Sequence, residues 1–139
     1  MRTDFLADGP RYLSRPGDPP ERTGATAINE AIDAAEARSL STASFVECSM
    51  IVESRCGPDG VRDLFVAKAQ ISLAPVDEEQ ANLARRAFRK YGKGRHPAGL
   101  NCGDCFSYAL SKALQEPLLF KGNDFSQTDV DCHPGSASA

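Results

Sequence analysis

Residues 101–124 constrain the fold of this chain more than any other stretch. Apolar residues recur at helical spacing after Asn101, either Asn101 or Gly103 can cap the helix, and Pro117 marks the point where it must end. The apolar run at residues 118–120 is long enough for a buried strand and too short for a helix. Asp104 then lies in the first turn of the helix, and Asp124 lies just beyond the strand. One helix–strand unit therefore brings two acids to an edge where open α/β sheets bind ligands.

The rest of the chain alternates between helical and extended patterns. Helices are predicted over residues 26–38, from Thr42 or Ser44 to Gly57, over residues 59–69, and from a cap at Asp77 to Tyr91, with strands over residues 39–41 and 71–76. Gln80 stands three residues after Asp77, as a capping box requires. Because helices alternate with short strands, we expect an α/β fold around a small, mostly parallel sheet.

The N-terminal residues give the weakest pattern. Residues 5–7 could be the inner end of a short strand that Asp8 follows, but four prolines and three glycines between residues 9 and 24 predict a loop. Serine, alanine, glycine and proline dominate the end of the chain and predict fraying. We therefore expect an irregular segment over residues 1–25, one domain over residues 26–130 and a flexible tail over residues 131–139.

Composition limits the classes of function. The 139 residues suit one domain, and an apolar fraction of 41% is typical of a globular protein. A net charge of −3 gives no global attraction to nucleic acid, so any polyanion must be bound by a local patch. No apolar stretch is long enough to span a membrane, and the N-terminus lacks a signal-peptide pattern. We expect a cytoplasmic protein with reduced cysteines and no membrane partner.

Three acids form the first candidate site. Glu47 and Asp104 are predicted at helix starts, and Asp124 at a strand end. Converging carboxylates can hold hard divalent cations such as Mg²⁺, which activate water and stabilise charge on a phosphate. The same positions also favour acids for structural reasons, because negative charge stabilises a helix N-terminus and aspartate is common in turns. Spacing alone leaves both interpretations open.

A basic segment precedes Asp104. It contains no acid and carries Arg85, Arg86, Arg89, Lys90, Lys93, Arg95 and His96. The arginines in the helix are also compatible with an ordinary solvated face, balanced by acids at the helix start. In the loop over residues 92–100, glycines free the backbone around the last three of these side chains. We expect Lys93, Arg95 and His96 to contact the phosphates of a nucleic acid.

Cys102 and Cys105 form a Cys-X-X-Cys pair. Such a pair can bind zinc or carry out redox chemistry, but zinc would need two more ligands, and Cys132 and His133 lie in the predicted tail. A redox role would require a thioredoxin-like sequence pattern around the pair, which the sequence does not show. The pattern favours small buried or half-buried cysteines, with a zinc or redox module as an alternative.

Three segments closely resemble the VapC-type toxins of the PIN-domain family. They are Ser-Thr-Ala-Ser-Phe-Val-Glu (41–47), Tyr-Gly-Lys-Gly-Arg-His-Pro-Ala-Gly-Leu-Asn-Cys-Gly-Asp-Cys-Phe-Ser-Tyr-Ala-Leu (91–110) and Pro-Leu-Leu-Phe-Lys-Gly-Asn-Asp-Phe (117–125). The resemblance spans residues 26–130 and implies a three-layer α/β/α PIN fold. It also implies a ribonuclease that depends on Mg²⁺ or Mn²⁺, an RNA substrate, an antitoxin protein as partner and a homodimer.

The resemblance also assigns the site. It places catalytic and metal-binding acids at Glu47, Asp104 and Asp124, although many relatives carry the last acid two residues earlier, where this chain has Gly122. The family begins with an apolar strand that ends in an acid followed by a small hydroxyl residue. Asp8 is the nearest candidate for that fourth metal ligand, and Asp4 is the second.

Two functions follow from this comparison. The first is a metal-dependent endoribonuclease, the toxin of a type II toxin–antitoxin system. The alternative is a degenerate PIN domain that binds an antitoxin but does not cleave RNA, because the first strand and its acid are poorly matched. The N-terminal segment is the feature that distinguishes them.

Overall fold

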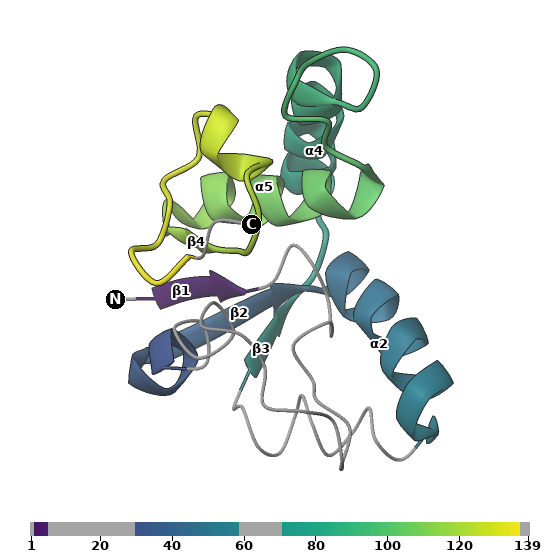
Figure 1. Ribbon diagram of the computed structural model, residues 1–139, viewed down its shortest axis with the longest axis vertical. Helices are drawn as coiled ribbons and strands as arrows, with labels where there is room; N and C mark the ends of the chain where they lie inside the picture. The colour runs from purple at the N-terminus through teal and green to yellow at the C-terminus, as the bar shows by residue number, and fades with distance from the viewer. Residues whose placement is uncertain (1, 6–29, 59–70, 137–139) are drawn as a thin grey trace.

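The computed structural model describes residues 2–5, 30–58 and 71–136 (Figure 1). In this part of the chain, four parallel strands form one sheet in the order β3-β2-β1-β4. The strands are β1 (Arg2–Phe5), β2 (Ala37–Ser41), β3 (Ile71–Ala74) and β4 (Leu118–Leu119). The predicted class, α/β around a small parallel sheet, is confirmed.

The N-terminal strand lies in the middle of the sheet. β1 pairs with β2 on one side and with β4 on the other, and Asp4 is in register with both Ser39 and Leu118. The sequence suggested a short strand over residues 5–7; β1 is described from Arg2 to Phe5, and residues 6 and 7 lie outside the described residues. Hydrogen bonds between backbones need no apolar side chains, so this short polar strand gives no hydrophobic signal. Asp8 lies outside the described residues.

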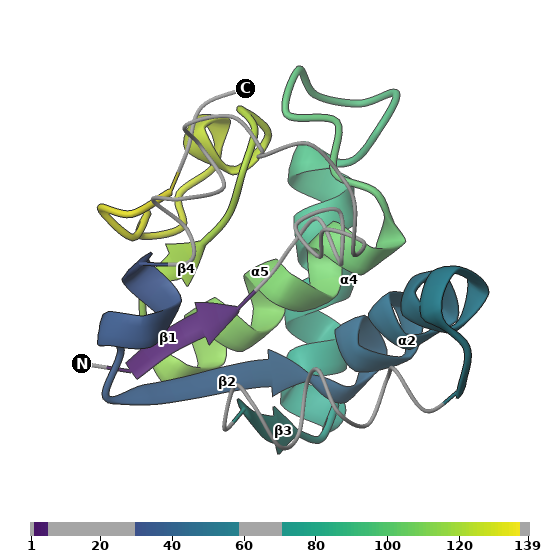
Figure 2. The ribbon, with the colours of Figure 1, turned by 60° about the horizontal axis from the view of Figure 1, so that its bottom comes forward.

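Helices cover the sheet unevenly. The described helices are α2 (Thr42–Cys56), α4 (Glu78–Tyr91), α5 (Cys102–Leu114) and the 3-10 helix η3 (Phe125–Gln127), with a further helical turn over residues 30–34. α5 crosses one face of the sheet and α4 packs against it, whereas the turn over residues 30–34 lies on the opposite face (Figures 1 and 2). None of the described helices has the length and apolar character needed to cross a membrane.

Helix ends follow the predicted caps with one difference. Asp77 caps α4 by accepting a hydrogen bond from the backbone N–H of Gln80 at 2.8 Å. The Gln80 side chain does not complete a capping box; its amide donates instead to the carbonyl of Pro75 at 3.0 Å. Gln80 therefore ties the helix to the segment that follows β3.

The predicted helix over residues 26–38 is too long at its C-terminal end. The described helical turn stops at residue 34, and β2 begins at Ala37. Arg38 donates to the carbonyl of Ile32 at 2.6 Å, so its side chain closes the end of the turn from within the strand. Alanine favours helix, but pairing with β1 and β3 outweighs that local preference. The predicted helix over residues 59–69 lies outside the described residues.

The C-terminal segment pairs with β4. Residues 131–136, for which the sequence suggested a flexible tail, run beside β4: Leu118 N–H donates to Asp131, and His133 N–H donates to Leu118. The Ser136 hydroxyl accepts from the N–H of Phe120 at 3.1 Å. The main cluster of buried side chains lies between α4, α5 and the residues around β4. This packing fixes the start of α5 relative to the sheet.

Candidate functional site

α2 begins directly where β2 ends, which carries Glu47 to the carboxyl edge of the sheet. Ser41 is both the last residue of β2 and the N-cap of α2, and its hydroxyl accepts from the N–H of Ala43 at 3.3 Å. Glu47 was predicted at the helix start, but it lies in the second turn of α2, which has no acid in its first turn, and it is exposed. Its position agrees with the rule that ligands bind beyond the carboxyl ends of parallel strands.

The Glu47 carboxylate lies directly against Gly103 in the first turn of α5. A Cβ built on Gly103 would stand 2.8 Å from the Glu47 carboxyl carbon, with one carboxylate oxygen still closer. Any side chain at this position would therefore displace Glu47. Glycine at 103 allows an acid on α2 to approach the residue next to Asp104.

Asp104 forms the capping box that begins α5. The Asn101 side chain accepts from the Asp104 N–H at 2.9 Å, and Oδ2 of Asp104 accepts from the Asn101 N–H at 2.9 Å. Asp104 is only 5% exposed. The reciprocal bonds fix its carboxylate, and the positive end of the helix dipole favours its negative charge.

Two buried serines join the helices beneath these acids. The hydroxyls of Ser44 on α2 and Ser107 on α5 lie 3.3 Å apart and share a hydrogen bond. Ser44 precedes Glu47 by about one helical turn, and Ser107 follows Gly103 by about one turn. The two contacts therefore form successive layers of one helix–helix interface. The sequence gives no local signal of this role, because the two serines are 63 positions apart.

We predict that the two serines are energetically coupled. Ser44→Ala or Ser107→Ala should each lower the free energy of unfolding by about 1–2 kcal/mol, because each leaves the other buried hydroxyl without its partner. The double replacement should cost clearly less than the sum of the two. Urea unfolding of the three variants measures this coupling. Additive losses would show that the hydroxyls do not stabilise one another.

Asp124 follows β4 and immediately precedes η3. It is exposed, and its side chain makes no capping hydrogen bond. Phe125, which is 2% exposed and packs on Phe120 with ring centres 5.3 Å apart, anchors this turn in the core. Gly122 has a φ of 100°, a conformation that an aspartate adopts only with strain. The turn therefore accounts for glycine at 122.

The described residues bring only part of the predicted acidic set together. The Glu47 carboxylate reaches Gly103, the neighbour of Asp104, but no three histidine, cysteine, aspartate or glutamate side chains in the described ranges are grouped closely enough to hold a metal ion. Asp4 is placed by its backbone at the next-to-last position of β1. The convergence of Asp124 and an N-terminal acid on this pair stays a prediction.

The basic loop divides into two kinds of residue. Lys93 and Arg95 are exposed, and Arg95 lies over the ring of Phe88 at 5.4 Å. His96 is half-buried: its Nδ1 accepts from the N–H of Ala98 at 3.0 Å, and its ring packs edge-on against Tyr91. The loop thus presents Lys93 and Arg95 to solvent, while His96 also holds the loop in shape.

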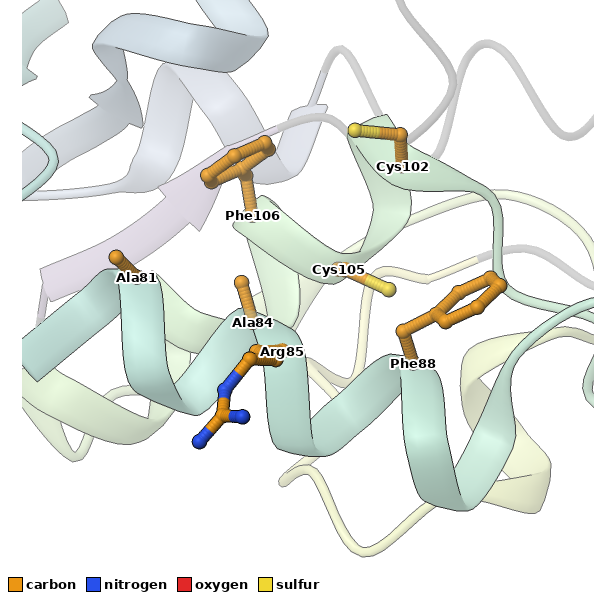
Figure 3. A pocket seen from close by; sticks show the side chains of 7 residues that line it. All are labelled: Ala81, Ala84, Arg85, Phe88, Cys102, Cys105 and Phe106. Carbon is orange, nitrogen blue, oxygen red and sulfur yellow. The ribbon is translucent and has the colours of Figure 1, made fainter.

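Two cysteines, Cys102 and Cys105, flank Gly103 and Asp104 at the start of α5. Cys102 is exposed, whereas Cys105 is 4% exposed and faces a pocket of about 400 Å³ between α4 and α5 (Figure 3). Burial, together with the charge of Asp104, raises the pKa of Cys105 to about 11. On α2, burial and the charge of Glu47 raise the pKa of Cys48 to about 12. Both thiols are therefore protonated at neutral pH.

Comparison with known proteins identifies relatives over most of the chain. A family model described as the PIN domain matches residues 21–131. A Ribonuclease VapC from Mycolicibacterium smegmatis is 56% identical over 95 residues, which are 67% of this chain and 74% of the relative. Ribonuclease VapC30 from Mycobacterium tuberculosis is 51% identical over 102 residues, which are 72% of this chain and 78% of the relative. Ribonuclease VapC28 from the same species is 47% identical over 109 residues, covering 76% and 82%.

Proposed function

The chain belongs to the PIN-domain family, among the VapC-type toxins, and on that premise we propose that it is a metal-dependent endoribonuclease. Its substrate is RNA, and its partner is the cognate antitoxin protein of a type II toxin–antitoxin system. We also propose a cytoplasmic homodimer. The contact of Glu47 with Gly103 carries the proposal, because it places an acid of α2 against the residue next to Asp104 on α5, inside the matched region.

The acids suit a hard divalent cation. Carboxylate oxygens are the ligands that Mg²⁺ and Mn²⁺ prefer in proteins. Glu47, Asp104 and Asp124 would hold the ion together with an acid from the N-terminal segment, either Asp8 or Asp4. A bound ion supplies activation of water and neutralisation of charge on the scissile phosphate.

Neighbouring residues hold Glu47 and Asp104 in position. The capping box holds the Asp104 carboxylate in one orientation, and Gly103 leaves room for Glu47. The bond between Ser44 and Ser107 fixes the spacing of the helices that carry them. Ligands held in place in this way lose little conformational entropy when an ion binds.

β1 favours Asp4 as the acid from the N-terminal segment. The strand is central, and its carboxyl end lies at the same edge as the end of β2, from which α2 begins. Asp4 stands one residue before that end. We predict that Asp4→Asn removes most cleavage of RNA and that Asp8→Asn retains it. Parallel cleavage assays on the two variants test the assignment, and the reverse pattern would assign the ligand to Asp8.

The basic loop and the end of α4 are proposed to bind the RNA backbone. Lys93 and Arg95 are exposed, and the last turn of α4 adds Arg89 and Lys90. His96 would contribute from the inner side of the loop. Cations that contact phosphates release counterions when RNA binds, and this makes affinity depend on salt but not on sequence.

We predict that replacing both Lys93 and Arg95 with alanine weakens binding of many RNA sequences by a similar factor. The slope of log affinity against log salt should become shallower by about 0.7 per lost contact to single-stranded RNA. The matched control is the pair Lys93→Arg and Arg95→Lys, which keeps both charges and should keep the slope. Loss of binding for one sequence alone would mean that the loop contacts bases.

The degenerate PIN domain remains the second candidate. The specific observation in its favour is in the sequence: Phe5 follows Asp4 and Gly9 follows Asp8, where the family's first strand has a small hydroxyl residue after its acid. Such a protein would bind its antitoxin through the same fold and cleave no RNA. Cleavage measured with and without a chelator separates the two candidates.

A further inference from the structure

The proposed ribonuclease function leaves the cysteine pair in the first turn of α5 without a role. Cys102 is the first residue of the helix and is exposed, and Cys105 follows one turn later and is buried. Both line the pocket between α4 and α5 (Figure 3). We propose that Cys102 and Cys105 are a thiol–disulfide site, which a low-molecular-weight disulfide oxidises to an internal disulfide across this turn.

The backbone geometry permits this bond. Residues three apart in an α-helix have Cα atoms about 5 Å apart, within the range of about 4.4–6.8 Å that disulfides span. In Figure 3 the two sulfur atoms point in different directions, so Cys102 must rotate about its Cα–Cβ bond. That rotation is open to Cys102, because no helical turn precedes it to restrict its rotamers.

The pocket gives a small reagent access to the pair. Its walls are mainly apolar, from Ala84, Phe88 and Phe106, and Arg85 is its charged residue. An exposed guanidinium at this position can attract the carboxylates of an anionic disulfide such as glutathione disulfide. Cys102 reacts first, because its thiol is exposed whereas that of Cys105 is buried.

The reaction balances in two exchanges. The Cys102 thiolate attacks one sulfur of the reagent, which breaks the S–S bond of the reagent, forms a mixed disulfide and releases one thiol. Cys105, whose thiol must first give up its proton to solvent, then attacks the Cys102 sulfur, forms the internal disulfide and releases the second thiol. Two electrons pass from the protein to the reagent, and the two protons of the cysteines end on the two released thiols.

Oxidation should disturb the acidic pair, an effect that rests on the proposed function. The Cβ atoms must approach from about 5–6 Å to about 3.5–4.5 Å, so the first turn must tighten. Gly103 and Asp104 lie inside the closed ring. When the first turn of α5 tightens, Gly103 moves relative to Glu47, and the hydrogen bonds of the capping box that orients Asp104 are strained. We expect the oxidised protein to bind Mn²⁺ about tenfold more weakly, as when a partner of a metal ligand is lost.

The test uses the full chain, reduced and then exposed to glutathione disulfide. Remaining thiols are blocked, and tryptic peptides are analysed by mass spectrometry. Residues 96–112 form one tryptic peptide that contains both cysteines. It should lose the mass of two hydrogen atoms, and dithiothreitol should reverse the loss. Cys132→Ser, which removes another exposed thiol, is the matched control and should react like wild type.

Two variants test the order of the two thiol–disulfide exchanges. Cys105→Ser should stop at a stable glutathione adduct on Cys102. Cys102→Ser alters an exposed side chain and should leave Cys105 unmodified. A persistent adduct on Cys102 in wild type, or no reaction at all, would overturn the proposed site. Mn²⁺ titration of the oxidised and reduced forms adds an independent readout. Equal Mn²⁺ affinity of the two forms would overturn the coupling between the disulfide and the acids. Absence of Mn²⁺ binding in both forms would contradict the proposed function but leave the disulfide result intact.

Discussion

Asp104→Asn should lower RNA cleavage by at least about a hundredfold, because loss of a mere partner of a metal ligand already costs about 10–100-fold. The change removes a negative charge from the proposed metal site. It leaves an oxygen that can still accept from the Asn101 N–H, so the helix keeps its capping box. Stability should change by less than about 1 kcal/mol. Expression should cease to be toxic while antitoxin binding survives.

Asp77→Asn is the matched control. Asp77 caps α4 by accepting from the N–H of Gln80, so this variant also removes an acid from a helix start. It lies outside the proposed site and should retain cleavage. If Asp104→Asn cleaves as well as Asp77→Asn in Mg²⁺, then Asp104 has only its capping role and the proposed site is wrong.

Gly103→Ala should separate activity from stability. The added methyl group would occupy the place of the Glu47 carboxylate, which must move away from the start of α5. Glu47 is an exposed and flexible side chain, so its displacement costs little. Alanine also favours helix over glycine by up to about 1 kcal/mol. We expect cleavage and Mn²⁺ affinity to fall about tenfold, with an unchanged or higher melting temperature.

A double-mutant cycle tests the cause of that loss. In a Glu47→Gln background the metal ligand is already impaired, so Gly103→Ala should add little further loss of Mn²⁺ affinity. Calorimetric titration of the four proteins measures the coupling. Two losses that simply add would mean that the methyl group acts on something other than Glu47.

Local patterns predicted the elements around the site well. Asn101 and Asp104 predicted the start of α5, and the capping box confirms it. Asp77 and Tyr91 likewise mark the ends of α4, because caps and periodic apolar residues are encoded over a few neighbouring positions. The PIN-domain match confirms the family that the resemblance indicated.

Features that depend on distant residues were not predicted. The central position of β1 arises from backbone pairing with β2 and β4, which its polar sequence does not reveal. Gly103 looks like any glycine near a helix start until the contact with Glu47, 56 positions earlier (103 minus 47), is known. The bond between Ser44 and Ser107 has the same origin. Such contacts belong to the tertiary structure and leave no local signal.

Cleavage of RNA by the purified wild-type chain, with Mg²⁺ or Mn²⁺ removed by a chelator and then restored, tests the central claim most directly. The account predicts cleavage that stops with the chelator and returns with the ion, because converging carboxylates without a cation supply neither activated water nor charge neutralisation. Asp104→Asn, run alongside, excludes a contaminating nuclease. Absence of any chelator-sensitive cleavage in the wild-type protein, with antitoxin binding intact, would contradict the account and identify a PIN domain that has lost its activity.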